Sequence, residues 1–195
     1  MSGGRKPAAG RIRIIGGGLR NSRLEVPDLP GLRPTPERVR ETLFNWLAPV
    51  IAGAQCLDLC AGTGALGIEA LSRGAAGVRF VECDARAVQA LRDNLARLKA
   101  GGGQVTMVDA SIFLQGKAQP QDLVFLDPPF ALELWPALAR QLEQGGWLAP
   151  RAWIYVESPR GMVPALPPGW LLHREGEAGE VRFALYRRAL PSRQR

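Results

Sequence analysis

The sequence predicts an α/β protein with a mostly parallel, seven-stranded sheet of the Rossmann-like kind. From Gln55 onward, apolar runs alternate with helical patterns, and this order is typical of right-handed βαβ units. A glycine-rich turn, GTGALG, follows the first of these strands. Two strand-like runs joined by the turn-rich EGEAGE end the main body as a hairpin, which adds an antiparallel edge strand to the sheet.

The main body divides into strands and helices at clear local signals. Asp84 is the expected N-cap of a long helix, and Gly74 ends the helix that follows the glycine-rich turn. The expected strands are Gln55–Leu59, Val78–Glu82, Gln104–Val108, Leu123–Asp127, Trp153–Glu157, Trp170–Arg174 and Val181–Arg188. The expected helices are Ala65–Arg73, Ala85–Lys99, Ser111–Gln115 and Trp135–Gln144.

A separate N-terminal segment precedes this body. Ile12 and Ile14 alternate with arginines at a period of two. After a turn at 16–18, a second short strand at Arg23–Val26 completes the pattern of a β-hairpin. We therefore expect a basic hairpin extension over residues 1–34, the main domain over 35–190 and a basic tail over 191–195.

A helix is predicted directly after the hairpin. Thr35 is its expected N-cap, with Pro36 at the first helical position and Glu37 in the first turn. Arg38 and Arg40 project elsewhere than the apolar stripe of this helix, so we expect both to be free for a ligand. The stripe, assigned to core packing, consists of Val39, Leu43, Phe44 and Leu47.

The net charge of +7 is concentrated at the two ends of the chain. Residues 1–50 carry nine Lys and Arg against four Asp and Glu, whereas residues 51–186 carry twelve against fourteen. This asymmetry favours a polyanionic partner, although solvated charged termini would give the same count. No apolar run approaches a membrane span and no signal-peptide pattern is present, so we expect a cytoplasmic protein without a membrane partner. Three cysteines, one histidine and the lack of a C-x-x-C pattern predict reduced thiols and no metal site.

The glycine-rich turn points to a cofactor that contains adenosine. Its glycines match the G-x-G-x-x-G fingerprint, and Glu82 lies twenty residues beyond Gly62, where a carboxylate would meet ribose hydroxyls. Asp58 stands just before the turn, where it would repel a pyrophosphate but attract an amino acid's ammonium group. S-adenosylmethionine has that ammonium group and no phosphate, so the turn favours it over a nicotinamide cofactor.

The stretch LDPPF, at the end of the fourth strand of the main body, is suited to binding an amine. Asp127 offers a carboxylate, and Pro128 and Pro129 offer carbonyls without competing N–H donors. An exocyclic base amine could give its two hydrogens to the Asp127 carboxylate and the Pro128 carbonyl, which would direct its lone pair at a sulfonium methyl. Phe130 could stack on a base that has been flipped out to reach the site. The plain alternative is a tight Pro-Pro turn with an incidental aspartate.

Together, DLCAGTG at 58–64 and DPPF at 127–130 resemble the amino-group methyltransferases of the class I S-adenosylmethionine-dependent fold. The resemblance extends over nearly the whole chain to the bacterial RsmD family, through RIRIIGG, LRPTPERVRETLFNWL, GALGIEALSRGA, FVECD, DLVFLDPPF and IYVES. That family methylates N2 of a guanine in 16S ribosomal RNA. One departure is Arg20-Asn21-Ser22-Arg23-Leu24, where the family usually has R-G-R-x-L, so a basic residue is missing at Ser22.

The resemblance implies a role for each group of residues. The methionine end of the cofactor would lie against Asp58, Ala61, Gly62, Thr63 and Gly64, with Glu82 on the ribose and with Cys83, Asp109 and Ala110 around the adenine. Asp127, Pro128, Pro129 and Phe130 would hold the guanine amine. Arg11, Arg13, Arg20, Arg23, Arg33, Arg38 and Arg40 would grip RNA, with Arg160 as a further candidate. No metal is implied, and S-adenosylhomocysteine would be the product.

Other functions remain open at this point. The same chemistry could act on adenine N6 of DNA or RNA, or on a protein glutamine. Outside that chemistry, the alternatives are a nicotinamide-dependent oxidoreductase and an RNA-binding module without activity. We expect a monomer whose partner is 16S ribosomal RNA, either free or within a small-subunit particle.

Overall fold

The computed structural model describes residues 10–189 as one seven-stranded sheet, covered by helices on both faces, and a separate two-stranded hairpin. The strand order is β5-β4-β3-β6-β7-β9-β8, so the predicted fold class is confirmed. The N-terminal elements are β1 (Gly10–Arg13), β2 (Arg23–Val26) and α1 (Glu37–Leu47). The next are β3 (Gln55–Asp58), α2 (Ala65–Ser72), β4 (Gly77–Glu82), α3 (Ala85–Arg97), β5 (Gly103–Met107) and α4 (Ala110–Phe113). The last are β6 (Gln121–Leu126), a short 3₁₀ helix (Phe130–Leu132), α5 (Trp135–Gln144), β7 (Leu148–Pro159), β8 (Trp170–Ala178) and β9 (Val181–Arg188).

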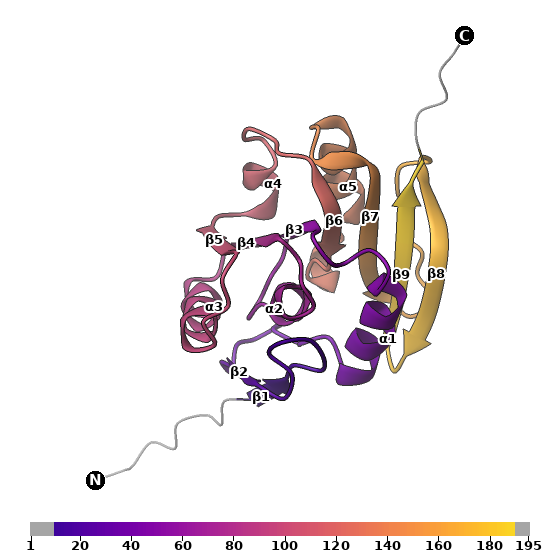
Figure 1. The fold of residues 1–195 in the computed structure, drawn as a ribbon. Helices are drawn as coiled ribbons and strands as arrows, with labels where there is room; N and C mark the ends of the chain where they lie inside the picture. Colours follow the sequence, from indigo (N-terminus) through magenta and orange to yellow (C-terminus); the bar gives the residue numbers. More distant parts are fainter. Residues whose placement is uncertain (1–9, 190–195) are drawn as a thin grey trace.

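The sheet separates two hydrophobic layers. Five neighbouring strands, β5, β4, β3, β6 and β7, run parallel to one another. Strand β9 pairs antiparallel with both β7 and β8, and β8 and β9 form the predicted C-terminal hairpin. Helices α1, α2 and α3 lie on one face and α4 and α5 on the other (Figure 1). Gly67 in α2 lets that helix approach the sheet closely, because a Cβ there would meet the ring of Phe80 at 2.2 Å. Among residues 10–189, no helix is long and apolar enough to cross a lipid bilayer.

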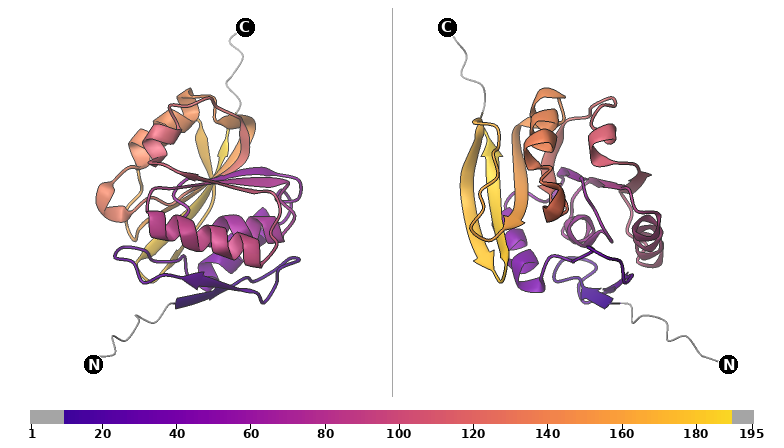
Figure 2. Two further views of the ribbon diagram at one scale, coloured as in Figure 1. Left: turned by 90° about the vertical axis from the view of Figure 1, so that its left-hand side faces the viewer. Right: turned by 180° about the vertical axis from the view of Figure 1, so that it is seen from behind.

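The N-terminal hairpin is fixed to the main body by buried polar contacts. The carboxylate of Glu69, in α2, is fully buried and accepts hydrogen bonds from the backbone N–H groups of Ile15 and Gly16, each at 2.9 Å. In α3, the Asn94 side chain bonds both the N–H and the C=O of Glu25. Figure 2 shows the hairpin lying along this side of α3. The inner side chains of the hairpin, Ile12, Ile14, Leu24 and Val26, belong to the same core as α1 and α2. The division of the chain at residue 34 stays a prediction.

The expectation that Arg40 is free for a ligand is wrong. Its side chain is only 2% exposed and lies 3.7 Å from Glu69. It also donates to the backbone carbonyls of Arg13 and Thr35. Arg40 lies on α1 next to the apolar stripe, so its long aliphatic stem enters the core and its guanidinium meets groups that need donors. Arg38, two residues earlier, is exposed as expected.

The predicted cap of α1 is also wrong. The Thr35 side chain accepts no hydrogen bond from the first turn, and Pro36 takes the N-cap position without a side-chain cap. The Thr35 hydroxyl instead donates to the Glu157 carboxylate at 2.6 Å, and a hydrogen bond to a charged acceptor is stronger than one between neutral groups, which favours this position of the side chain. The predicted cap of α3 is confirmed, since Asp84 accepts from the N–H groups of Arg86 and Ala87.

The two arginines of α1 allow a matched test of this packing. We expect Arg40→Ala to lower the free energy of unfolding by about 3 kcal/mol, because it leaves Glu69 with less positive charge in a dry site. Arg38→Ala, on the same helix, should change it by less than about 0.5 kcal/mol. Urea denaturation of the two variants checks this, and equal effects would contradict the buried network.

Candidate active site

The residues predicted for cofactor and substrate come together at the carboxyl edge of the parallel strands. The loops that follow β3, β4, β5 and β6 carry them (Figure 1). Parallel strands end at one edge, so four segments distant in sequence meet there. This arrangement was predictable, because it follows from the parallel direction of the strands.

The glycine-rich turn is shaped by two positive φ angles and by close packing. Gly62 has φ of 55° and Gly64 has φ of 84°, values that favour glycine. A Cβ on Gly64 would meet the Leu91 side chain at 2.3 Å, and a Cβ on Gly62 would meet Leu32 at 2.9 Å. Leu32 belongs to the segment between β2 and α1, which we call the connector (residues 27–36). The connector therefore lies against the glycine-rich turn.

Glu82 organises this turn through its carboxylate. One oxygen accepts from the N–H of Gly62 at 2.8 Å, and the other accepts from the N–H groups of Cys83 and Asp84 at 2.8 and 2.9 Å. A carboxylate has about four acceptor positions, so these three bonds leave room for a further donor. Glu82 thus joins the end of β4 to the turn after β3.

Asp58 is a buried acid at the base of the turn. Its side chain is 2% exposed and accepts a hydrogen bond of 3.0 Å from the N–H of Gly67 in α2. The pKa of Asp58 is raised to about 7, mainly by burial and also by the negative charges of Glu82 and Glu157, which together outweigh the lowering effect of the Gly67 N–H. No cation offsets this charge among the described residues, so the position is suited to a positively charged ligand group.

Other predicted cofactor residues line the same edge. Ala61 and Thr63 are buried in the turn, with the Ala61 N–H bonded to the Val81 carbonyl at 2.9 Å. Cys83 is exposed just after β4. Asp109 caps the short helix α4 by accepting from two backbone N–H groups, and Ala110 behind it is buried.

The DPPF segment leaves the sheet at the end of β6 and enters a short 3₁₀ helix. Asp127 is half-buried, Pro128 is buried and Pro129 is exposed. The ring of Phe130 is half-buried against Trp135, with centroids 5.8 Å apart. Burial and the charges of Glu157 and Asp58 hold the pKa of Asp127 well above its usual range.

Glu157, at the same edge, was missed as a site residue. It is 3% exposed, and one of its carboxylate oxygens accepts from the hydroxyls of Thr35 and Tyr155 at 2.6 and 2.9 Å. A signal was available, because Glu157 ends a predicted strand beside the one that carries Asp127. The negative charge of Glu157 raises the pKa of both Asp58 and Asp127, and Asp58 adds to the effect on Asp127. Within 10–189, no cluster of His, Cys, Asp or Glu has the arrangement of a metal site.

The predicted RNA-binding arginines fall into three groups. Arg40 is buried, as described above. Arg11, Arg13 and Arg160 are exposed but paired with the carboxylates of Glu25, Glu37 and Glu177, respectively. The third group of these predicted residues is exposed and has no ion pair with any carboxylate in the described part of the chain; it consists of Arg20, Arg23, Arg33 and Arg38.

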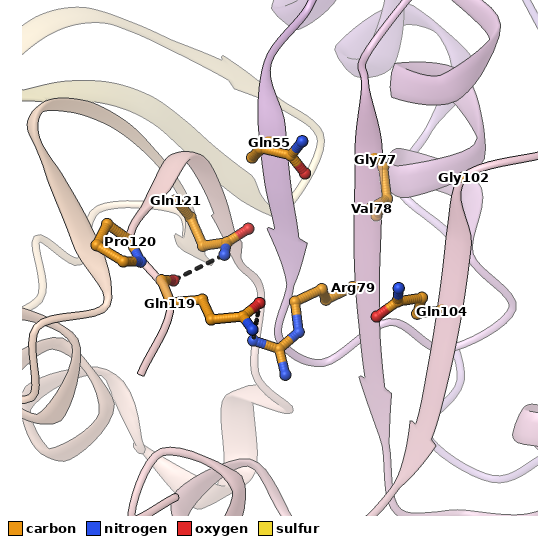
Figure 3. Close-up of a pocket in the computed structure, with 9 residues that line it drawn as sticks. All are labelled: Gln55, Gly77, Val78, Arg79, Gly102, Gln104, Gln119, Pro120 and Gln121. Atoms are coloured by element: carbon orange, nitrogen blue, oxygen red, sulfur yellow. Dashed lines mark hydrogen bonds between the residues drawn. The ribbon is translucent and has the colours of Figure 1, made fainter. Parts of the chain in front are cut away.

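A separate hollow of about 150 Å³ lies at the opposite, amino-terminal edge of the sheet (Figure 3). Gln55, Gly77 and Gln121 line it where their strands begin, together with Arg79 and Gln119. Arg79 donates to the Gln119 side chain across one wall at 3.3 Å. The residues predicted for chemistry lie at the other edge, so this hollow is not the candidate site.

Comparison with known proteins places the chain among RNA methyltransferases. The family model described as conserved hypothetical protein 95 matches residues 12–187. The chain is 55% identical over 181 residues to ribosomal RNA small subunit methyltransferase D of Escherichia coli K12, covering 92% of this chain and 91% of that protein. The protein of the same name from Haemophilus influenzae is 43% identical over 183 residues, covering 92% and 95%.

Solved structures agree with this similarity. The Escherichia coli protein yhhF, described as a methyltransferase, superposes with a TM-score of 0.86 at 52% identity, over 93% of this chain and all of that one. An RNA methyltransferase from Salinibacter ruber, solved with S-adenosyl-L-homocysteine, shares the fold with a TM-score of 0.64 at 18% identity, over 84% and 98%.

The buried acid of the turn gives a prediction about stability and pH. The folded-state pKa of Asp58, about 7, lies above the value near 4 of an unfolded aspartate. Its contribution to stability is therefore fully present below about pH 4 and is lost as the pH rises through about 7. Asp58→Asn stays neutral and keeps an acceptor for Gly67. We expect its free energy of unfolding, relative to the unsubstituted chain, to rise by at most about 4 kcal/mol over this range.

Urea denaturation of the ligand-free chain between pH 4.5 and 7.5 measures this difference. The exposed Asp28 serves as the control, since the free energy of unfolding of Asp28→Asn should change with pH as that of the unsubstituted chain does. If the free energy of unfolding of Asp58→Asn also changes with pH in the same way, Asp58 is not held neutral by its surroundings.

Proposed function

This chain belongs to the conserved hypothetical protein 95 family, the RsmD family that its motifs resemble, and on that premise we propose that it methylates N2 of a guanine in small-subunit (16S) ribosomal RNA. The observation that carries the proposal is the position of the DPPF segment at the end of β6, next to the glycine-rich turn after β3. An acceptor for an amine and a loop for a nucleoside cofactor then share one edge of the sheet.

The chemistry of the donor groups fits S-adenosylmethionine. Asp58 is a buried carboxylate without a described cation partner, and a cationic amino-acid group would relieve its desolvation. Glu82 keeps acceptor capacity for a ribose hydroxyl while holding the Gly62 N–H. Cys83, Asp109 and Ala110 are proposed to flank the adenine. A pyrophosphate would bring more negative charge to an edge already rich in carboxylates, which disfavours a nicotinamide cofactor.

When bound, this cofactor supplies a methyl group on a positively charged sulfur. The DPPF segment would hold the guanine amine by accepting its two hydrogens, one at the Asp127 carboxylate and one at the Pro128 carbonyl. Both acceptors are fixed before the amine arrives, and this preorganisation is the main way in which such a site accelerates transfer. No cysteine follows the prolines of DPPF, where a carbon-methylating enzyme would need its nucleophile, so direct transfer to nitrogen is proposed.

The base has to leave its stack to reach this edge. Phe130 is half-exposed and supported by Trp135, so its ring is a rigid platform on which a flipped base could stack. The unpaired arginines of the N-terminal segment are proposed to hold the RNA backbone nearby. Arg33 is next to Leu32, which contacts the glycine-rich turn, and this brings the RNA contacts close to the reacting atoms.

Two other amines would suit the same acceptors: adenine N6 and the side chain of a protein glutamine. The DPPF segment does not separate them from guanine N2. The guanine is favoured by the family, because the similar proteins of E. coli and H. influenzae are named as small-subunit ribosomal RNA methyltransferases.

The direct test is mass mapping of modified guanines in 16S RNA from cells with and without this chain. We expect one N2-methylguanine to disappear in its absence and to return with the intact chain. Asp127→Ala should not restore it, because loss of one preorganised acceptor costs roughly 3 kcal/mol of transition-state stabilisation, or about a hundredfold in rate. A lost adenine or glutamine methylation instead would assign the alternative substrate. The same assay on free RNA and on assembled particles identifies the substrate form.

The binding of S-adenosylmethionine by Asp127→Ala is the control for this variant. Calorimetry should give an affinity within about threefold of the unsubstituted chain, since Asp127 is placed for the amine and not for the cofactor. Turnover near that of the intact chain would remove Asp127 from the proposed role.

The unpaired arginines predict the salt dependence of RNA binding. Replacing Arg20, Arg23, Arg33 and Arg38 by Gln should flatten the slope of log affinity against log salt by about 3, if each meets one phosphate of single-stranded RNA. Removing four exposed cations outside the N-terminal segment, Lys117, Arg140, Arg151 and Arg174, is the matched control and should change the slope little. Equal slopes for the two variants would contradict an RNA grip in the N-terminal segment.

A further inference from the structure

Glu157 and Asp127 occupy equivalent positions on neighbouring parallel strands. In the β6–β7 register, Leu126 pairs with Val156, so Asp127 and Glu157 are the next residues along each strand. Two residues earlier, Phe125 and Tyr155 lie in the same core, which puts both acids on the face of α1 and α2. Two carboxyl groups therefore lie close together at the proposed acceptor site.

Hydrogen bonds hold only one of these two acids. Glu157 accepts from the hydroxyls of Thr35 and Tyr155, and both bonds reach the same oxygen, Oε1. Its Oε2 has no hydrogen-bond donor among the described residues. Donors to the charged form favour ionisation, so Glu157 is the better supported anion of the pair.

The other groups around Asp127 are acidic or neutral. Asp58 faces it from β3, Cys60 from the glycine-rich turn, and Tyr155 and Glu157 from β7. No Lys, Arg or His among residues 10–189 lowers the pKa of Asp127 by its positive charge. A negative Glu157 is therefore the largest charge acting on Asp127.

We propose that Glu157 is a positioning residue for methyl transfer: held by Thr35 and Tyr155 beside Asp127, its charge keeps Asp127 able to take the proton that the methylated amine releases. The proposal rests on the proposed amino-methyltransferase function. During transfer, the nitrogen lone pair forms the new bond to carbon, and the electrons of the broken carbon–sulfur bond stay on sulfur. The nitrogen then loses one proton, which passes to the Asp127 carboxylate and from there to water.

The proposal explains why a charged residue stands at position 157, which packing alone does not require. A neutral residue could accept the same two hydroxyl bonds without the cost of a buried charge. The buried charge is useful for catalysis if it raises the proton affinity of Asp127, because a base works best when its pKa lies near the working pH. Glu157 therefore acts through Asp127 and needs no contact with the substrate.

Glu157→Gln separates charge from structure, since the amide oxygen can still accept from Thr35 and Tyr155. In the ligand-free chain, carbon NMR of side-chain carboxyls should show the Asp127 titration moving to lower pH by about one unit. Its signal is assigned by its loss in Asp127→Asn. Glu157→Asp keeps the charge and should leave this titration near that of the intact chain. If Glu157→Gln does not fold, Glu157→Ser removes the charge in a smaller side chain and should give the same shift.

Single-turnover methylation of small-subunit RNA between pH 5.5 and 9 gives the second readout. The acidic limb of the rate should move to lower pH in Glu157→Gln and stay in place in Glu157→Asp. A variant that is merely slower, with both the titration and the limb unmoved, overturns the proposal and makes Glu157 a structural residue. If the intact chain methylates no RNA amine, the proposed function fails instead, while the carboxyl titration still decides whether Glu157 acts on Asp127.

Discussion

The buried carboxylate of Glu69 is the contact on which the N-terminal half of the structure depends. It accepts from two N–H groups of the turn after β1 and from Arg73, and it lies beside Arg40 of α1. Three segments distant in sequence thus converge on one charge. Helix α2, which carries Glu69, also begins at the glycine-rich turn. The hairpin that carries arginines proposed to bind RNA and the turn proposed to bind the cofactor are therefore parts of one rigid unit, in which neither can shift without disturbing a buried ion.

The acids at the carboxyl edge, unlike Glu69, lack cationic partners among the described residues. Asp58, Asp127 and Glu157 are acids whose surroundings supply few positive charges, and burial raises the pKa of each. Such an edge is poorly stabilised by itself and is suited to a ligand that brings positive charge. The chain thus neutralises its buried acid at Glu69, where rigidity is needed. It leaves its acids without cations at the edge where binding and proton transfer are proposed.

The sequence was sufficient for the alternation of strands and helices along the chain and for the mostly parallel sheet with its C-terminal hairpin, because the apolar and helical patterns record them directly. It was also sufficient for the positions of DPPF and the glycine-rich turn, since parallel strands bring their carboxyl ends together. Prediction from the sequence failed for residues whose hydrogen-bond or ion-pair partners are distant in the sequence. Periodicity put Arg40 off the apolar stripe, but only the folded chain brings Glu69 and the Arg13 carbonyl to it. Thr35 has the residue type of a cap, yet its hydroxyl donates to Glu157, 122 positions away. Glu157 itself was passed over because its one signal, a place at the end of a predicted strand, does not by itself distinguish a site acid from any other acid at a strand end.

The arginines that carry no structural bond have an evolutionary consequence. Arg20, Arg23, Arg33 and Arg38 are exposed and have no ion pair with a described carboxylate, whereas Arg40 and Arg73 hold the fold together. Substitution at the first four positions can therefore change the proposed RNA contacts at little risk to folding. Selection for a different RNA surface could act on these positions while the cofactor turn and the acids of the carboxyl edge stay as they are. Ser22, where the family resemblance implies a basic residue, lies in this permissive stretch between Arg20 and Arg23.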